Sequence, residues 1–480
     1  MSTPPEILGT LRISQAESLD FAKLSGDYNP IHVDMVAARR MVYGGTVVHG
    51  IHACLLAVAM VLRQSGATKL SLNKLQARFS SPIRQGELVQ VIVKKRQAGN
   101  VHKLTLECNG IRAQSISLDY SAATVTDIEN SPDESTPALA CRKLLFTDAR
   151  RQKGEVELVL DKEALGRLMP AVAKHLPYRQ TSQLLSLTRI VGMICPGEDS
   201  LFTKFSLTFS PGINAVEKKL RYKVTTADER FARITMGVDC QDLVGEVHAN
   251  FRTPFVKQAS YEYIAAKVTP KAFAGQRAIV IGGSRGLGEV TAKLIAAGGG
   301  VPLITYYRGE DDARLVQSEI HAGHGNCEVM EFNVLKPSFE QMSSLFSGLP
   351  PSNLYYFATP PIRFNNSGTW NAELYATYHA YFVEGYSKTI ETMLKCWPDS
   401  NQGLTIFNPS SIFLDKPESG AAEYIVAKGA AEAYGQYLNG ITPNITVHNV
   451  RLPRISTDQT SGVDSDKLQD PLQIMLEVLS

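Results

Sequence analysis

A glycine-rich turn between an apolar strand and a helix start constrains the fold of this chain most strongly. The run from Arg277 to Gly288, RAIVIGGSRGLG, has the pattern of a buried strand, a tight turn and the first residues of a helix. Glycines at such a turn let the backbone approach a pyrophosphate, which then lies at the helix N-terminus. Strand-like runs such as VPLITYY and CEVMEFNV alternate with helical ones after it. That alternation predicts an α/β domain with a doubly wound parallel sheet.

The residues after the second strand of this sheet bear on the cofactor. Arg308 follows Gly288 by about 20 residues, where an acid would bind the ribose 2′-hydroxyl of a dinucleotide. Arg308 and Arg285 instead predict a 2′-phosphate, and hence NADPH. The alternative is that Arg285 and Arg308 are solvated surface residues that do not contact a cofactor.

A second constellation lies further along the same domain. Tyr424 and Lys428 are four residues apart, so they share one helix face. We expect the ammonium to lower the pKa of the phenol and make Tyr424 a proton donor near neutral pH. Ser411 precedes Tyr424 by 13 residues and is placed to hydrogen-bond a reacting carbonyl.

The glycine turn, serine, tyrosine and lysine together resemble the short-chain dehydrogenase/reductase family over about residues 275–460. The resemblance implies a Rossmann-type fold, with Ser411, Tyr424 and Lys428 as the catalytic set. It also implies a set of cofactor-binding positions: Gly282, Ser284, Arg285, Gly286, Leu287, Gly288, Arg308, Asn333, Val334, Ala358, Tyr424 and Lys428.

The sequence departs from that family's pattern in four places. The NNAG stretch reads Phe357-Ala-Thr-Pro360, and Phe382 is near the position of a catalytic Asn. The Pro-Gly after the sixth strand reads Pro453-Arg454, and the helix-like LQIMLEVLS stands where we expect the last parallel strand to be missing. These departures put the proton relay and the family's tetramer packing in doubt.

The N-terminal region carries a different chemistry. A turn rich in Gly, Asn and Pro holds Asp27 and His32 five positions apart, in the string FAKLSGDYNPIHVD. An acid and an imidazole form the pair that adds or removes water across a C=C bond. Gly50 is near the start of an apolar helix predicted over Val47–Leu62, where backbone N–H groups can face a thioester enolate. A turn in which Asp27 caps a helix is the alternative.

This string, the later VVHG and the strand FSSPIRQGELV resemble MaoC-like (R)-specific enoyl-thioester hydratases and dehydratases, over about residues 10–120. The resemblance implies a hot-dog fold and catalytic roles for Asp27 and His32. It also implies an oxyanion-hole role for the region of Gly50.

The chain of 480 residues divides near 1–125, 140–256 and 275–480, at seams over Thr126–Ala138 and about Val256–Ala274. The first segment has one long helix and several alternating strands, an α+β layout. The middle segment has similar ingredients but no second Asp/His pair. It is similar to a degenerate second hot-dog repeat; an unrelated α+β domain is the alternative. Paired hot-dog folds in one chain would replace the usual dimer, and a homodimer is the other arrangement.

Composition excludes several classes. The formal charge of +2 gives no sign of a nucleic-acid partner, and seven cysteines without paired spacing predict free thiols. No Cys/His cluster has the spacing of metal ligands, so no metal is expected. No apolar run reaches the ~20 residues of a membrane span, so we expect a cytoplasmic enzyme without a membrane partner.

The two chemistries share one substrate class. A reductase of this type converts a 3-oxoacyl to a 3-hydroxyacyl thioester, and a hot-dog dehydratase converts that product to an enoyl thioester. We therefore expect a bifunctional enzyme acting on acyl-CoA or acyl carrier protein. A hydratase with an impaired nucleotide-binding domain and a non-catalytic thioester-binding scaffold are the alternatives.

Overall fold

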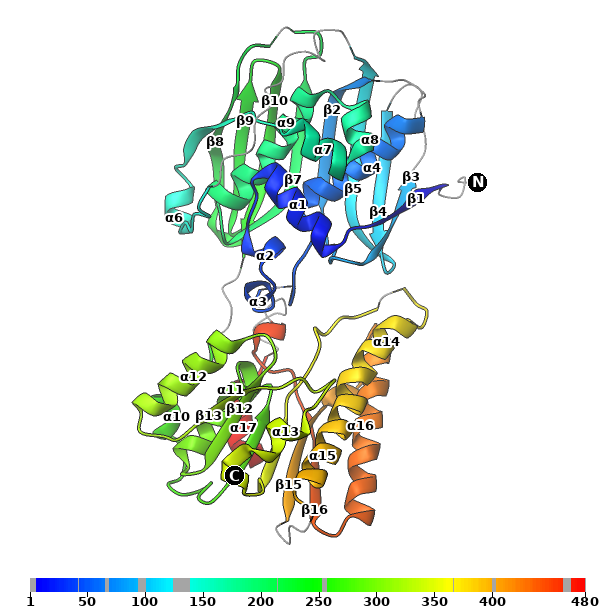
Figure 1. Cartoon of the computed structure of the whole chain (residues 1–480). Coiled ribbons are helices and arrows are strands. Elements are labelled where there is room, and N and C mark those ends of the chain that lie inside the picture. Colours follow the sequence, from blue (N-terminus) through cyan, green and yellow to red (C-terminus); the bar gives the residue numbers. More distant parts are fainter. Residues whose placement is uncertain are drawn as a thin grey trace. The chain divides into compact units, whose positions relative to one another are not determined.

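The computed structural model describes residues 6–41, 43–64, 69–93, 101–123, 139–213, 215–252, 257–365, 367–398, 403–460 and 468–479. Two compact units make up the chain, with the division between Pro254 and Phe255 (Figure 1). The first predicted seam, Thr126–Ala138, lies outside the described residues.

The N-terminal unit contains one ten-stranded antiparallel sheet in the order β1-β3-β4-β5-β2-β7-β10-β9-β8-β6. The order β1-β3-β4-β5-β2 recurs as β6-β8-β9-β10-β7, so the same five-stranded arrangement occurs twice. The halves join where β2 pairs with β7, with Leu75 opposite Leu207. This is a double hot-dog arrangement.

Each half has a similar order of elements along the chain. The strands are β1 (Glu6–Arg12), β2 (Leu70–Phe79), β3 (Leu88–Val93), β4 (Val101–Cys108), β5 (Ile111–Ala122), β6 (Lys153–Glu157), β7 (Ser200–Phe209), β8 (Lys219–Asp228), β9 (Arg233–Cys240) and β10 (Leu243–Phe251). The helices are α1 (Gln15–Ser25), α2 (Pro30–Val33), α3 (Met35–Ala38), α4 (Gly50–Gln64), α6 (Phe146–Ala149), α7 (Lys162–Leu168), α8 (Pro170–His175), α9 (Tyr178–Arg189) and the π-helical turn η1 (Ile190–Ile194).

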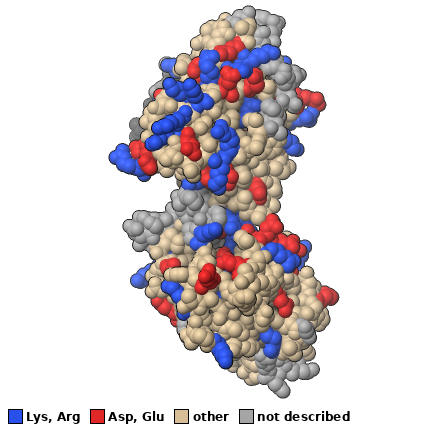
Figure 2. Space-filling view, turned by 90° about the vertical axis from the view of Figure 1, so that its left-hand side faces the viewer, with Lys and Arg blue, Asp and Glu red and all other residues tan. Residues whose placement is uncertain are grey.

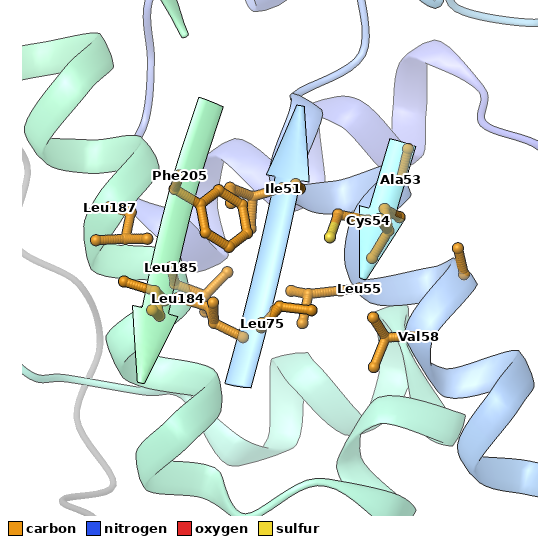
Figure 3. Packing of buried hydrophobic residues seen from close by; sticks show 14 of the residues in the cluster. Ile51, Ala53, Cys54, Leu55, Val58, Leu75, Leu184, Leu185, Leu187 and Phe205 are labelled. Atoms are coloured by element: carbon orange, nitrogen blue, oxygen red, sulfur yellow. The ribbon is translucent and has the colours of Figure 1, made fainter. Parts of the chain in front are cut away.

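The helices cover one face of this sheet, and α4 and α9 pack against its centre (Figure 1). Ile51, Leu55 and Val58 of α4 are buried in the same cluster as Leu75 of β2 and Phe205 of β7 (Figure 3). The three leucines of α9 in that cluster are Leu184, Leu185 and Leu187. Strand residues alternate between this core and the outer face, which fixes the pairing register.

The C-terminal unit contains a six-stranded parallel sheet in the order β13-β12-β11-β14-β15-β16. This is the doubly wound order 3-2-1-4-5-6 of the Rossmann type. Ala278 and Val280 of β11 belong to one apolar cluster, whereas Ile279 and Ile281 belong to another. Both faces of the sheet are therefore covered, as in parallel sheets generally.

The elements of this unit alternate along the chain as the sequence predicts. The strands are β11 (Arg277–Ile281), β12 (Val301–Tyr306), β13 (Glu328–Glu331), β14 (Asn353–Tyr356), β15 (Leu404–Ser411) and β16 (Ile445–Leu452). The helices are α10 (Tyr261–Ala265), α11 (Gly286–Ala297), α12 (Glu310–Ala322), α13 (Phe339–Ser343), α14 (Ala372–His379), the π-helical turn η4 (Ala380–Glu384), α15 (Gly385–Cys396), α16 (Ala422–Ile441) and α17 (Pro471–Leu479).

The structure corrects two boundaries. The long apolar helix begins at Gly50 and not at Val47, because Val47 forms a β-bridge with Arg84. The predicted seam over Val256–Ala274 holds α10, and its side chains Ile264 and Phe273 are buried in the C-terminal core. Part of that segment therefore belongs to the C-terminal unit.

Three further observations bear on the chain as a whole. All seven cysteines are free thiols, as expected from their spacing. No helix among the described residues combines the length and apolar character needed to cross a bilayer. Lysines and arginines are interleaved with acids on the visible surface of both units (Figure 2), in keeping with the small net charge.

Candidate active sites

The first site is built on a turn that the local sequence specifies closely. Helix α1 ends at Gly26, whose φ of 73° is readily adopted only by a residue without a Cβ. Asn29 then caps α2 by accepting a hydrogen bond from the N–H of Ile31, with Pro30 at the first helical position. This arrangement buries Asp27 and places His32 on the short helix that follows.

His49, which directly precedes α4, lies against Asp27 and His32 of this turn. The His32 and His49 rings stack with their centroids 3.8 Å apart. His49 Nε2 is 2.9 Å from the backbone oxygen of Asp27 and 3.9 Å from its Oδ2. His32 Nδ1 is 2.9 Å from the carbonyl oxygen of Val47, which can only accept, so Nδ1 carries the proton and Nε2 keeps a lone pair.

The second half of the unit completes this site. Thr188 of α9 donates its hydroxyl proton to Asp27 Oδ2 at 2.6 Å. Asn29 Nδ2 donates to the carbonyl oxygens of Gly192 and Gly197 at 3.0 and 3.1 Å. A Cβ at Gly192 would lie 2.2 Å from Asp27 Oδ1, so only glycine leaves room for the carboxyl group. The second half therefore holds Asp27 and Asn29 in position, although its own sequence has no Asp/His pair of this kind.

Burial acts on the two titrating groups in opposite directions. It raises the pKa of Asp27, against the influence of His32 and the hydrogen bond from Thr188. It lowers the pKa of His32, against the influence of Asp27. Both shifts favour a protonated acid beside a neutral imidazole, which is the state of a general acid paired with a general base.

Gly50 is the first residue of α4, where backbone N–H groups have no acceptor within the helix. A Cβ at Gly50 would lie 3.0 Å from Cε1 of Phe79, so the absence of a side chain lets Phe79 pack on the helix start. Gln114 Nε2 donates to the carbonyl oxygen of Gly50 at 3.1 Å and fixes this peptide. The first turn of α4 thus offers N–H groups, as an oxyanion site requires.

The same three side chains form a cluster that the sequence spacing does not reveal. One atom each of Asp27, His32 and His49 lies within 4.8 Å of the others, a distance compatible with metal ligands. However, the hydrogen bond from His49 Nε2 to the Asp27 carbonyl requires a proton on that nitrogen. That nitrogen is a hydrogen-bond donor in this arrangement, and we interpret the cluster as a proton-transfer site.

The second candidate site is at the carboxyl edge of the parallel sheet. Gly282 follows β11, Arg308 follows β12, Asn333 follows β13 and Ala358 follows β14, each by one or two residues. Because parallel strands end at the same edge, these positions line one crevice edge at the point where the strand order reverses. Ser411 is the last residue of the neighbouring strand β15.

The glycine turn has the geometry that a pyrophosphate requires. Gly282 and Gly286 have φ of 74° and 57°. A Cβ at Gly288 would lie 2.4 Å from the oxygen of Gly282, so the third glycine lets α11 approach the turn. Thr305 anchors the turn to β12 by accepting the N–H groups of Gly282 and Gly283. The turn therefore fits a dinucleotide at the N-terminus of α11.

The two arginines predicted to select a 2′-phosphate differ in their surroundings. Arg285 Nη1 is 3.3 Å from Asp458 Oδ2, so this guanidinium already faces a carboxylate. Arg308 is exposed, with its guanidinium 5.4 Å from the centre of the Tyr307 ring. No motif in the sequence marks Asp458 as a neighbour of this turn.

Ser411, Tyr424 and Lys428 come together on β15 and α16. Tyr424 is buried and hydrogen-bonds Ser411, and its phenol is enclosed by the rings of Tyr378 and Phe382 at 5.6 Å. The expected pKa of Tyr424 is wrong for this structure. Burial raises it to about 12, because the desolvation of a phenolate exceeds the effect of the Ser411 hydrogen bond.

Lys428 explains part of that difference. Its Nζ donates to the carbonyl oxygen of Pro409 at 2.7 Å and lies 4.1 Å from the centre of the Phe382 ring. Burial lowers its pKa to about 7, so a large fraction of the amine is uncharged at neutral pH. Phe382 lies next to Lys428, near the position where the family resemblance implies an Asn. Its ring offers no side-chain hydrogen bond.

Comparisons with known proteins match the N-terminal part of the chain to one family model. Residues 2–111 match the model of the MaoC like domain. A probable dehydratase, NIT22, of Ajellomyces capsulatus is 33% identical over 96 residues, which are 19% of this chain and 25% of that protein. A 3-hydroxybutyryl-CoA dehydratase of Methylorubrum extorquens is 31% identical over 83 residues, 17% of this chain and 52% of that protein. The N-terminal part of the chain is thus a MaoC-like domain.

Solved structures resemble the C-terminal part. A short chain dehydrogenase of Burkholderia cenocepacia in complex with NADP has 22% identity and a TM-score of 0.38, covering 43% of this chain and 90% of that one. FolM alternative dihydrofolate reductase 1 of Brucella suis, also with NADP, has 18% identity and a TM-score of 0.37, covering 43% and 87%. This chain spans 25% of the length of the Ajellomyces relative and 52% of the length of the Methylorubrum relative.

Sequence reasoning missed three contributors to the first site. His49 belongs to the quoted VVHG but had no role assigned, although a His directly before the first glycine of an apolar helix is a usable signal. Thr188 and Gly192 follow Asp27 by more than 160 residues, and nothing local marks them. Only the pairing of the two halves brings them to Asp27.

Proposed function

We propose that the chain is a bifunctional enzyme, an NADPH-dependent 3-oxoacyl-thioester reductase and a 3-hydroxyacyl-thioester dehydratase or enoyl hydratase. The buried pair Asp27–His32 beside the first turn of α4 carries the proposal. The substrate is an acyl-CoA or acyl carrier protein thioester of fatty-acyl or polyketide-type metabolism. The match to the MaoC like domain and the name of the Methylorubrum relative support the choice of a hydroxyacyl thioester.

In the dehydration, His32 Nε2 removes a proton from the carbon next to the thioester carbonyl. Asp27 donates its proton to the 3-hydroxyl, the C–O bond breaks, and a C=C bond and water form. Thr188 and Asn29 hold the carboxyl group in place, and N–H groups at Gly50 stabilise the enolate oxygen. Hydration is the reverse, with Asp27 taking a proton from water.

In the reduction, Tyr424 donates a proton to the 3-oxo group, and Ser411 holds that oxygen by a hydrogen bond. The glycine turn would hold the dinucleotide pyrophosphate, with Arg308 at a 2′-phosphate. When bound, NADPH supplies the hydride. The other positions expected at the cofactor are Ser284, which is buried in the turn, and Val334, which is buried after β13.

A second candidate function is a hydratase whose C-terminal unit binds the nucleotide without reducing a substrate. Phe382 against Lys428 favours it, because no side-chain hydrogen bond at that position continues a proton path. The two candidates differ in one assay. NADPH oxidation with acetoacetyl-CoA supports the bifunctional enzyme, and nucleotide binding without oxidation supports the second candidate. Hydration of crotonyl-CoA, followed by loss of enoyl absorbance, tests the dehydratase in either case.

A further inference from the structure

A row of basic side chains crosses the outer face of the N-terminal sheet. Arg78 of β2 is directly opposite Lys204 of β7, and Lys204 is opposite His248 of β10. Arg233 of β9 adds a fourth basic group close enough to lower the pKa of His248, as Lys204 and Arg78 also do. The core side chains Ala77, Phe205 and Val247 alternate with the row. The row therefore points away from the helices.

The charge of this row is weakly compensated. Among the described residues, one ion pair involves this row, and it joins His248 to Glu246 at 3.9 Å. Directly opposed like charges destabilise an antiparallel pair, so Arg78 and Lys204 act against the sheet. At the β6 edge of the same sheet, Lys219 is paired with Glu155 and Arg221 with Asp239, whereas Lys153 and Lys223 form a second directly opposed pair of bases.

The row is at the end of the sheet that carries the first active site. Phe79 follows Arg78 and packs on Gly50, and the residue opposite Phe79, Gln114, donates to the Gly50 carbonyl. The row also bridges the two halves, because β2 and β7 are the strands that join them. A ligand held there would be at the same end of the strands as the helix start that we assign to the thioester, on the opposite face of the sheet.

We propose that Arg78, Lys204, His248 and Arg233 form the docking face for an acidic acyl carrier protein; this rests on the proposed hydratase function. The row spans four neighbouring strands, about 15 Å at the usual strand spacing. An open sheet face of that width suits a charged protein surface, whereas a free nucleotide is normally bound in a concave site. Electrostatic docking of this kind raises the association rate and weakens with salt.

The test compares one acyl group on two carriers. The double variant Arg78→Glu/Lys204→Glu is assayed for hydration of a crotonyl group on CoA and on a purified acidic acyl carrier protein. The matched control is Lys153→Glu/Lys223→Glu, an exposed cross-strand pair between β6 and β8. We expect kcat/KM for the carrier substrate to fall about tenfold in the first variant only, with CoA turnover within about twofold of wild type.

Other outcomes overturn the proposal in distinguishable ways. Equal losses with both substrates would assign the row to CoA phosphates or to folding. Unchanged carrier kinetics with a changed oligomeric state in light scattering would assign it to a second copy of the chain. If wild type hydrates neither substrate, the proposed function itself fails, and binding of the carrier protein measured by fluorescence anisotropy still decides the docking face.

Discussion

At the scale of single residues, the two proposed active sites differ in their chemistry and can be tested separately. Asp27→Asn removes the acid of the first site and retains its shape, so hydration of crotonyl-CoA should fall by about 10³-fold or more while reduction is unchanged. If Asp27→Asn abolished both hydration and reduction while its circular dichroism spectrum was unchanged, the model of two independent sites would be contradicted.

Tyr424→Phe is the reciprocal change. It removes the proton donor of the reductase but keeps the ring that packs between Tyr378 and Phe382. We expect loss of NADPH oxidation with full hydration activity, because Asp27 and Tyr424 belong to different compact units. Retained oxidation would show that another group protonates the carbonyl.

Lys428 gives the chain a pH-dependent stability with a defined sign. Its pKa is about 7 in the folded protein, below the value of 10.5 expected in the unfolded chain. Between these values only the unfolded state is protonated, so stability falls as the pH decreases from about 10.5 to 7 and is then constant. Lys428→Met removes this effect. The variant should therefore have a larger free energy of unfolding than wild type, as measured by urea denaturation. This difference should be larger at pH 7 than at pH 10. A pH-independent difference would mean that Lys428 is solvated.

Residue patterns predicted the pairs Asp27–His32 and Tyr424–Lys428 because each lies within one short motif. They did not predict the pKa of Tyr424, since the burial of its phenol depends on Tyr378 and Phe382 from another helix pair. They also could not find Thr188, whose contact with Asp27 depends on the pairing of β2 with β7.

At the scale of elements, the turn η1 determines the position of the acid. Gly192→Ala would place a Cβ 2.2 Å from Asp27 Oδ1, so the carboxyl group must move. We expect hydration to fall by at least about 10²-fold, because small misplacements of a catalytic group are costly. Gly166→Ala is the control, since nothing lies within 4 Å of its Cβ. Comparable activity of both variants would show that Asp27 need not stay in place.

Strands were predicted where apolar and polar residues alternate, as in β2, β5 and β8. The edge strands β1 and β6 were missed, because each buries a single side chain and has no such alternation. The helix signal of α9 was weak for the opposite reason. All its residues from Arg179 to Arg189 are buried, so its polar residues bond to neighbours and mark no solvent face.

At the scale of the whole molecule, the repeated strand order lets the second half support the single proposed catalytic pair of the first half. The first half supplies Asp27 and His32, and the second supplies Thr188, Gly192 and the acceptors for Asn29. We expect a fragment of residues 1–254 to hydrate crotonyl-CoA at about the rate of the full chain, and a fragment of residues 1–125 to be inactive. Activity of the shorter fragment as a monomer would contradict the supporting role of the second half.

The two proposed activities form a reaction sequence, because the product of the reduction would be the substrate of the dehydration. The most direct measurement incubates the purified chain with NADPH and acetoacetyl-CoA and identifies the acyl products by mass spectrometry. We predict crotonyl-CoA together with oxidation of NADPH, and 3-hydroxybutyryl-CoA alone from Asp27→Asn. Crotonyl-CoA hydration without any NADPH oxidation would contradict the bifunctional enzyme and leave a hydratase with a nucleotide-binding unit.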